Sequence, residues 1–151
     1  MKLKIIPICL ALALSINLTA CTSGKSTGKS TEISCDDFYK SQHISKQLEV
    51  TAGESFTVIL CSNASTGFRW SDSAQIGSPN VMEQTKHEYI MKEYKTPPPP
   101  GTPGQEIWTF KALRPGTSTT SMEYSRPWEG GEKREWTFKL TVVVKSGGKY
   151  E

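Results

Sequence analysis

The four cysteines are the side chains of this sequence with the widest choice of chemistry, and their positions narrow that choice. Cys9 lies within an uncharged apolar run over residues 5–14, which follows the positive charges of Lys2 and Lys4. A basic start and a short apolar run are typical of a secretory signal peptide, because the run is too short to remain as a membrane span. We therefore expect residues 1–20 to be a signal peptide that is removed.

Cys21 follows Leu18, Thr19 and Ala20, and this Leu-Thr-Ala-Cys pattern resembles the lipobox of bacterial lipoproteins. In that pattern a peptidase cuts before the cysteine and lipid is attached to its sulfur. The resemblance implies that Cys21 is the mature N-terminus and a lipid anchor to the bacterial cell envelope, in the outer membrane if the organism has one. The alternative is an ordinary signal peptide with a coincidental cysteine.

Cys35 and Cys61 remain, and an exported protein meets an oxidising compartment. We predict a disulfide between them, which would tie the N-terminal segment to the end of the apolar stretch at residues 55–61. Spacing alone does not establish that the two Cα atoms approach closely enough. A free buried thiol at Cys61, or an unpaired exposed thiol at Cys35, therefore stays open.

Other patterns that could bind phosphate or metal lack the spacing these sites need. A phosphate-binding P-loop has four residues between its first glycine and the Gly-Lys pair, whereas Gly24 and Gly28 have three between them. The Gly/Ser-rich residues 22–34 instead predict a flexible linker. His43 and His87 are isolated, with no cysteine or histidine at metal-binding spacing. We expect no metal, no cofactor and no catalytic residue.

Length and charge fit one exported domain without a nucleic-acid partner. The formal net charge is only +3, and nothing in the sequence implies a nucleic-acid partner, which would need a concentrated basic face. The predicted organisation is a signal peptide at 1–20, a lipid anchor and flexible tether at 21–45, a folded domain at 46–145 and a polar C-terminal tail at 146–151. We expect a monomer.

Strands must position any functional groups, because no stretch keeps helical spacing for three turns. The predicted strands cover residues 47–51, 55–61, 68–71, 87–94, 105–112, 117–124 and 134–145. Their alternation points three sets of side chains inward: Phe56, Val58 and Leu60; Trp108, Phe110 and Ala112; and Trp136, Phe138, Leu140, Val142 and Val144. About seven short strands with Gly/Pro turns predict an all-β fold, an immunoglobulin-like antiparallel β-sandwich.

Three stiff loops would lie at one end of this sandwich, because the loops after the second, fourth and sixth strands emerge together. We call them the first loop (residues 62–67), the second loop (95–104) and the third loop (126–133). A glycine closes the first loop, four consecutive prolines extend the second, and Arg-Pro-Trp opens the third. Stiff loops lose little entropy on association, so they predict a convex wedge that fills a groove.

The motifs NASTGF, GTPG and RPW on these loops resemble those of the chagasin-type inhibitors of papain-like cysteine proteases. That family carries Asn-Pro-Thr-Thr-Gly-Tyr/Phe, Gly-x-Gly-Gly and Arg-Pro-Trp/Phe in the same order, and the resemblance extends across most of residues 46–145. Each motif alone is weak, but three in register are specific. The resemblance implies a protease-binding set made of Asn63, Ala64, Ser65, Thr66, Gly67, Phe68, Gly101, Thr102, Pro103, Gly104, Arg126, Pro127 and Trp128.

Two of the motifs depart from the family. Ala64 stands where the family often has proline and Ser65 replaces a threonine, which predicts a less rigid first loop of similar shape. Pro103 replaces a glycine and restricts φ to negative values, which predicts a slightly different contact from the second loop. The third motif is intact.

The resemblance implies reversible, competitive and non-covalent inhibition. The tip of the first loop would enter the protease cleft beside the catalytic cysteine and histidine without presenting a scissile bond. Trp128 would lie against an aromatic wall on one side, and the second loop would clasp the other side.

The sequence leaves two other classes of function to consider: an enzyme and a non-inhibitory module. An enzyme is the weakest class, because the distinctive residues are Gly, Pro, Thr and Trp on protruding loops instead of a nucleophile or carboxylate pair in a concave site. The alternative is a non-inhibitory envelope module for adhesion or complex assembly, since a fold alone does not fix function.

Trp128 lies between Arg-Pro and Glu-Gly-Gly and is expected to be exposed, whereas Phe68 and Trp70 are expected to belong to the core.

Overall fold

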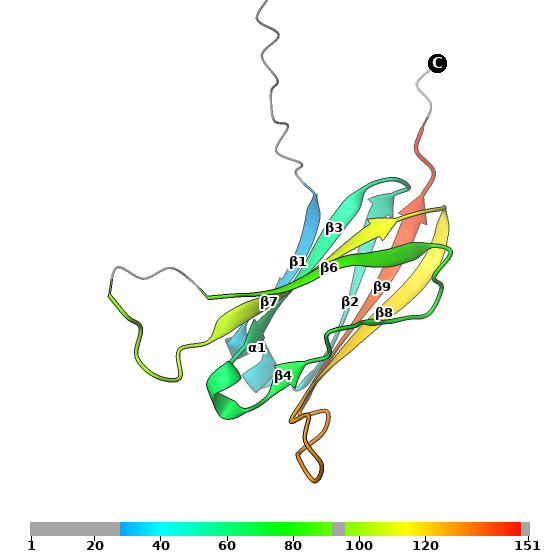
Figure 1. Cartoon of the computed structure of the whole chain (residues 1–151). Coiled ribbons are helices and arrows are strands. Elements are labelled where there is room, and N and C mark those ends of the chain that lie inside the picture. The colour runs from blue at the N-terminus through cyan, green and yellow to red at the C-terminus, as the bar shows by residue number, and fades with distance from the viewer. Residues whose placement is uncertain (1–27, 92–95, 149–151) are drawn as a thin grey trace, which may run out of the picture.

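Two β-sheets packed face to face form the fold of this chain (Figure 1). The computed structural model describes residues 28–91 and 96–148. One sheet has the strand order β1-β3-β7-β6, and the other has the order β2-β9-β8-β4, with β5 also paired to β8. The elements are β1 Lys29–Ile33, α1 Cys35–Lys40, β2 His43–Thr51, β3 Ser55–Ser62, the 3-10 helix η1 Ala64–Thr66, β4 Arg69–Trp70, β5 Gln75–Ile76, β6 Met82–Ile90, β7 Gly104–Ala112, β8 Gly116–Ser125 and β9 Trp136–Lys145.

The predicted immunoglobulin-like β-sandwich is confirmed, although each sheet carries one parallel edge pair. β1 pairs parallel with β3 and β2 pairs parallel with β9, whereas the remaining pairs are antiparallel. The parallel pairs arise because the N-terminal segment runs along one sheet as β1, crosses by α1, and then runs along the other sheet as β2. The strand predicted at residues 87–94 corresponds to β6, which begins and ends earlier in the chain. Polar and apolar residues alternate only weakly in this segment, so its sequence did not fix the bounds of the strand.

The N-terminal segment expected to be a flexible tether is folded from Lys29 onward. α1 begins with a capping box, in which the Asp37 amide donates to the Ser34 hydroxyl oxygen at 3.2 Å and the Ser34 amide donates to the Asp37 carboxylate at 3.0 Å. The hydrogen bonds from Ser34 lower the pKa of Asp37. The expectation of a flexible tether over 21–45 is therefore wrong for residues 29–45.

The predicted signal peptide and the predicted lipid-anchor cysteine lie outside the residues that the structure describes. Residues 1–20, Cys21 and the first part of the predicted linker precede the described residues. Within residues 28–91 and 96–148, no helix is long and apolar enough to cross a membrane.

The core between the sheets contains the faces predicted from alternation. The buried residues include Phe56, Val58, Leu60, Trp108, Phe110, Ala112, Trp136, Phe138, Leu140, Val142 and Val144. Trp70 is also buried, and Phe68 packs against the core from a partly buried position. These predicted inward faces are confirmed.

A disulfide joins the start of α1 to the end of β3. Cys35 and Cys61 are 26 positions apart in sequence, and their Cα atoms are 5.1 Å apart. Closing a loop of this length restricts the unfolded chain and stabilises the fold by about 3 kcal/mol. The bond also holds the strand end from which the first loop departs.

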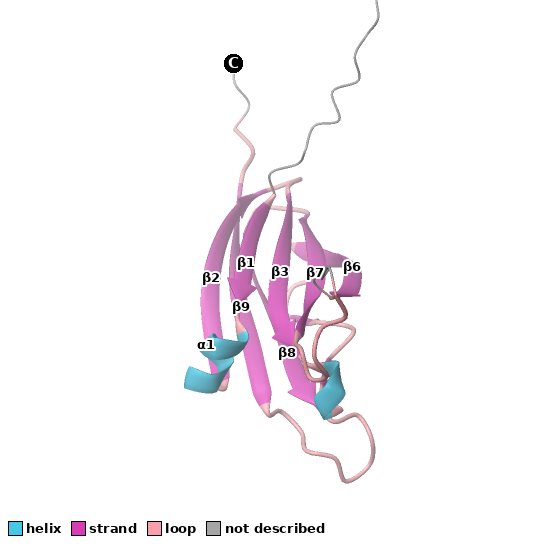
Figure 2. Ribbon diagram, turned by 90° about the vertical axis from the view of Figure 1, so that its left-hand side faces the viewer, coloured by secondary structure: helices cyan, strands magenta, loops and turns pink. Residues whose placement is uncertain are grey.

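The three loops emerge at one end of the sandwich, and the described chain termini lie at the other (Figures 1 and 2). This follows from strand direction, since Ser62 pairs with Gly104 and Ile90 pairs with Gln105 at the loop end. β1 starts at the opposite end, where Lys29 pairs with Phe56.

Candidate functional site

The first loop is a single 3-10 turn held by its own side chains. Asn63 caps the turn, because its side-chain oxygen accepts hydrogen bonds from the Ser65 amide at 3.2 Å and from the Ser65 hydroxyl at 2.7 Å. The Thr66 hydroxyl donates to the Asn63 carbonyl at 2.7 Å. Gly67 ends the turn with φ +77°, a conformation that glycine adopts without strain. These bonds restrain the first loop although it has alanine at position 64.

Asn63 also connects the first loop to the second. Its side-chain nitrogen donates to the Gly101 carbonyl at 2.9 Å. Its backbone amide donates to the Tyr124 hydroxyl oxygen at 2.9 Å, and that hydroxyl in turn lies 3.3 Å from the Asn63 carbonyl, to which it can donate. Asn63 therefore fixes the base of the loops, and its polar side-chain groups are engaged within the protein.

The described part of the second loop ends in a tight turn. The Thr102 amide and hydroxyl both donate to the Pro99 carbonyl, at 3.2 Å and 2.6 Å, and Gly101 has φ +86°. Gly104 is packed closely, because a Cβ at this position would lie 2.5 Å from the Tyr89 hydroxyl oxygen. Partial burial, followed by the nearby charge of Glu106, raises the pKa of Tyr89. The second loop is thus fixed mainly by local backbone geometry and by this tyrosine.

The third loop folds back on itself as a hairpin. The Arg126 amide donates to the Glu132 carbonyl at 2.8 Å, and the Gly131 amide donates to the Trp128 carbonyl at 3.1 Å. The Arg126 guanidinium forms an ion pair with the Glu132 carboxylate at 2.7 Å. The Trp128 side chain is 51% exposed, as predicted.

The first and third loops contact each other through an aromatic ring and a guanidinium group. The Trp128 ring covers Gly67 so closely that a Cβ on Gly67 would lie 2.6 Å from a ring carbon. The Arg126 guanidinium carbon lies 4.5 Å from the centre of the Phe68 ring and 5.9 Å from the Trp128 ring, which is cation–π geometry. Arg126 therefore braces the two loops.

Stacked aromatic rings connect these loops to the N-terminal helix. Phe38 of α1 stacks on Trp136 with ring centres 4.9 Å apart, and Trp136 stacks on Tyr124 at 4.7 Å. Tyr124 stacks on Phe68 at 5.4 Å, directly below Arg126. Such pairs contribute about 0.5–1.5 kcal/mol each beyond the area they bury. The loop end thus rests on a continuous column of rings.

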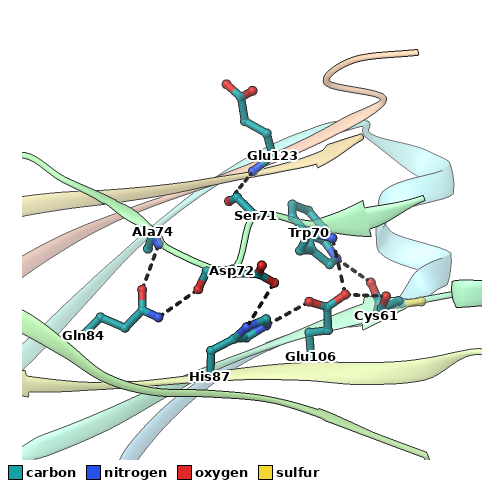
Figure 3. A network of polar contacts seen from close by, with 10 residues as sticks. Cys61, Trp70, Ser71, Asp72, Ala74, Gln84, His87, Glu106 and Glu123 are labelled. Atoms are coloured by element: carbon teal, nitrogen blue, oxygen red, sulfur yellow. Dashed lines mark hydrogen bonds and ion pairs between the residues drawn. The ribbon is translucent and has the colours of Figure 1, made fainter. Parts of the chain in front are cut away.

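A buried carboxylate supports the base of the first loop (Figure 3). Glu106 accepts hydrogen bonds from the Ser62 hydroxyl at 2.7 Å and from the Trp70 amide at 3.4 Å, and it lies 2.9 Å from His87 Nε2. The His87 ring stacks on Trp108. Sequence reasoning missed this network, although Glu106 continues the inward face of Trp108. Among the described residues, no group of three or more His, Cys, Asp or Glu side chains could hold a metal ion.

The structure gathers the motif residues on these three loops, with Phe68 directly after the first, and they differ in exposure. Ala64, Ser65, Thr66, Gly101, Pro103, Pro127 and Trp128 are exposed; Asn63, Gly67, Phe68, Thr102 and Arg126 are partly buried; and Gly104 is buried. The exposed members form the outer surface of the loop end. Asn63, Phe68, Gly104 and Arg126 hold that surface in place by internal contacts.

This arrangement of sandwich and loops is similar to that of known proteins. The profile of the family described as chagasin family peptidase inhibitor I42 matches residues 49–142. Amoebiasin-2 of Entamoeba histolytica is 26% identical over 117 residues, covering 74% of this chain and 92% of that protein. The crystal structure of the cysteine protease inhibitor EhICP2 from Entamoeba histolytica superposes with a TM-score of 0.59 and 21% identity, covering 79% of this chain and 98% of that one.

Proposed function

The chain belongs to the chagasin family of peptidase inhibitors, and on that premise we propose that it is a reversible, competitive protein inhibitor of papain-like cysteine proteases. The observation that carries the proposal is the bracing of three loops into one projecting end before any partner is present. Loops fixed in this way lose little conformational entropy on binding. EhICP2 is itself a cysteine protease inhibitor, and its likeness to this chain supports the protease class.

The tip of the first loop is the part that enters the protease cleft. Ala64, Ser65 and Thr66 are exposed and carry small side chains, so the tip is narrow. Internal hydrogen bonds hold it in a 3-10 turn instead of the extended form that a protease substrate adopts. Inhibition then needs no covalent step, and the proposal assigns no catalytic activity to this chain.

Trp128 and the second loop occupy the two sides of the cleft. Trp128 has half of its surface free to pack against an apolar wall, and tryptophan is a frequent anchor of binding energy. The exposed Gly101 and Pro103 lie on the second loop, where the bond from Asn63 places them beside the first.

We also propose that Cys21 anchors the protein to the bacterial cell envelope. β1 begins at the end of the sandwich opposite the loops, so an anchor preceding it leaves the loops pointing away from the attachment point. Replacing Cys21→Ser should abolish the incorporation of labelled palmitate. Undiminished labelling of that variant would contradict the lipoprotein proposal.

The inhibitor proposal is tested by titrating residues 22–151 against papain, with trypsin as a serine-protease control. This segment retains every described strand and both cysteines of the disulfide. We expect papain inhibition that increasing substrate relieves, an intact inhibitor by mass after incubation, and no effect on trypsin. A folded protein that leaves papain and related cysteine proteases active would contradict the proposal and favour the non-inhibitory envelope module.

A further inference from the structure

We propose that Lys133 is a positioning residue that fixes the third loop in its binding form before the protease arrives, and so sets the rate of association. The inference rests on the proposed inhibitor function. Lys133 lies outside the three motifs, and its role follows from contacts within the loop itself.

The Lys133 ammonium group bridges two carbonyl groups of the third loop. Its nitrogen donates to the Arg126 carbonyl at 2.5 Å and to the Trp128 carbonyl at 2.9 Å. An ammonium group has three donors, and hydrogen bonds that involve a charged group are stronger than neutral ones. Lys133 thus ties the backbone on both sides of Pro127 to the returning strand of the hairpin.

This part of the loop needs such a bridge because glycines follow Trp128. Gly130 has φ +72° and Gly131 follows it, and glycine has the largest backbone freedom of any residue. The Arg126–Glu132 contacts fix the base of the hairpin, whereas the Lys133 bridge joins the Gly131 amide in holding the Trp128 carbonyl. Without the bridge, we expect Trp128 to leave Gly67 for part of the time.

A positioning role predicts a particular kinetic signature. If only a fraction of free inhibitor has the binding form, the apparent affinity and the association rate fall by that fraction. Dissociation is unchanged, because the bound loop is the same. A residue that contacts the protease behaves differently, since losing its contacts mainly speeds dissociation.

The test compares Lys133→Met with Arg134→Gln in residues 22–151. Arg134 is the neighbouring cation, and its side chain pairs with Glu123 outside the third loop, so this control removes the same charge without removing the bridge. Association and dissociation rates with papain are measured by stopped flow at low and high salt. We expect Lys133→Met to slow association about threefold to tenfold at both salt concentrations. Its dissociation rate should stay within about twofold of the wild-type rate. Arg134→Gln should associate and dissociate like the wild type at high salt.

Several results would overturn the inference. An effect of Lys133→Met that disappears at high salt, or that Arg134→Gln reproduces, assigns the lysine to electrostatic steering. Faster dissociation assigns it to direct contact with the protease, and unchanged rates remove any role.

A measurement without protease separates this inference from the proposed function. The NMR order parameter of the Trp128 backbone amide should fall in Lys133→Met and recover in Lys133→Arg, which keeps donors at this position. An unchanged order parameter in Lys133→Met overturns the positioning role even if papain proves not to be the partner.

Discussion

The first and third loops are held by each other, whereas the second loop is held mainly by its own backbone. Trp128 covers Gly67 and Arg126 lies over Phe68, so the first and third loops share side-chain contacts. The second loop relies on consecutive prolines and a local turn at Gly101, with Asn63 as its hydrogen-bonded link to the first loop. Rigidity at one binding surface therefore has two origins, tertiary contact and local chain stiffness. They should respond differently to mutation.

The largest effect is expected at the tip of the first loop. Thr66→Arg places a long charged side chain where the inhibitor has to meet the catalytic pair of the protease, and it should weaken inhibition by about 3 kcal/mol or more. The β-sandwich should be little affected because Thr66 is exposed, although the substitution also removes the hydroxyl hydrogen bond to the Asn63 carbonyl in the first loop. Inhibition constants and thermal melts measure both effects. Thr117→Arg, an exposed threonine at the far end of β8, is the control and should inhibit normally.

The contact between the first and third loops is tested by Gly67→Ala. The added methyl group would lie 2.6 Å from the Trp128 ring and would also require a non-glycine residue at φ +77°. Gly53→Ala is a matched control, because Gly53 has φ +89° with nothing within 4 Å of an added Cβ. Both variants should lose about 1–2 kcal/mol of folding stability from backbone strain. Only Gly67→Ala should also lose inhibition, and equal inhibition by the two variants would contradict the proposed loop contact.

Trp128→Ala should weaken inhibition by about 2 kcal/mol, mainly through faster dissociation. The ring is half exposed, so its removal deletes partner contacts and also uncovers Gly67. Adding Gly67→Ala to this variant should cost less inhibition than it does in the wild type, because the clash is gone. Strictly additive losses in the double-mutant cycle would show that the first and third loops act independently.

The smallest effect is expected from separating the second loop. Asn63→Asp keeps an acceptor for the Ser65 amide but cannot donate to the Gly101 carbonyl. Loss of this one link should weaken inhibition by about 1 kcal/mol, with the first loop still formed. Association rates and the NMR shifts of the Ser65 and Gly101 amides would report the two loops separately. If the Ser65 and Gly101 amide shifts change by similar amounts, the conformation of the second loop depends on the first loop more than its local turn suggests.

Alternation in the sequence predicted the central strands and their inward faces, and the Arg-Pro and Glu-Gly-Gly segments on either side of Trp128 predicted its exposure, because each depends on local patterning. It did not predict β1, since a polar edge strand pairs through its backbone and needs no apolar face. A six-residue helix such as α1 is too short for a periodic signal, although Ser34 three residues before Asp37 has the spacing of a capping box. Contacts such as Trp128 over Gly67 join residues distant in sequence, and no local rule contains them.

The unequal burial of the tryptophans has an optical consequence. Of the four tryptophans, Trp70, Trp108 and Trp136 are buried, and Trp128 alone is half exposed. Indole emission shifts to shorter wavelength when water is removed, so covering the loop end should produce a blue shift from a single fluorophore. An aqueous quencher should reach that same fluorophore first. The protein thus carries an intrinsic, label-free reporter at the surface where we expect it to meet its partner.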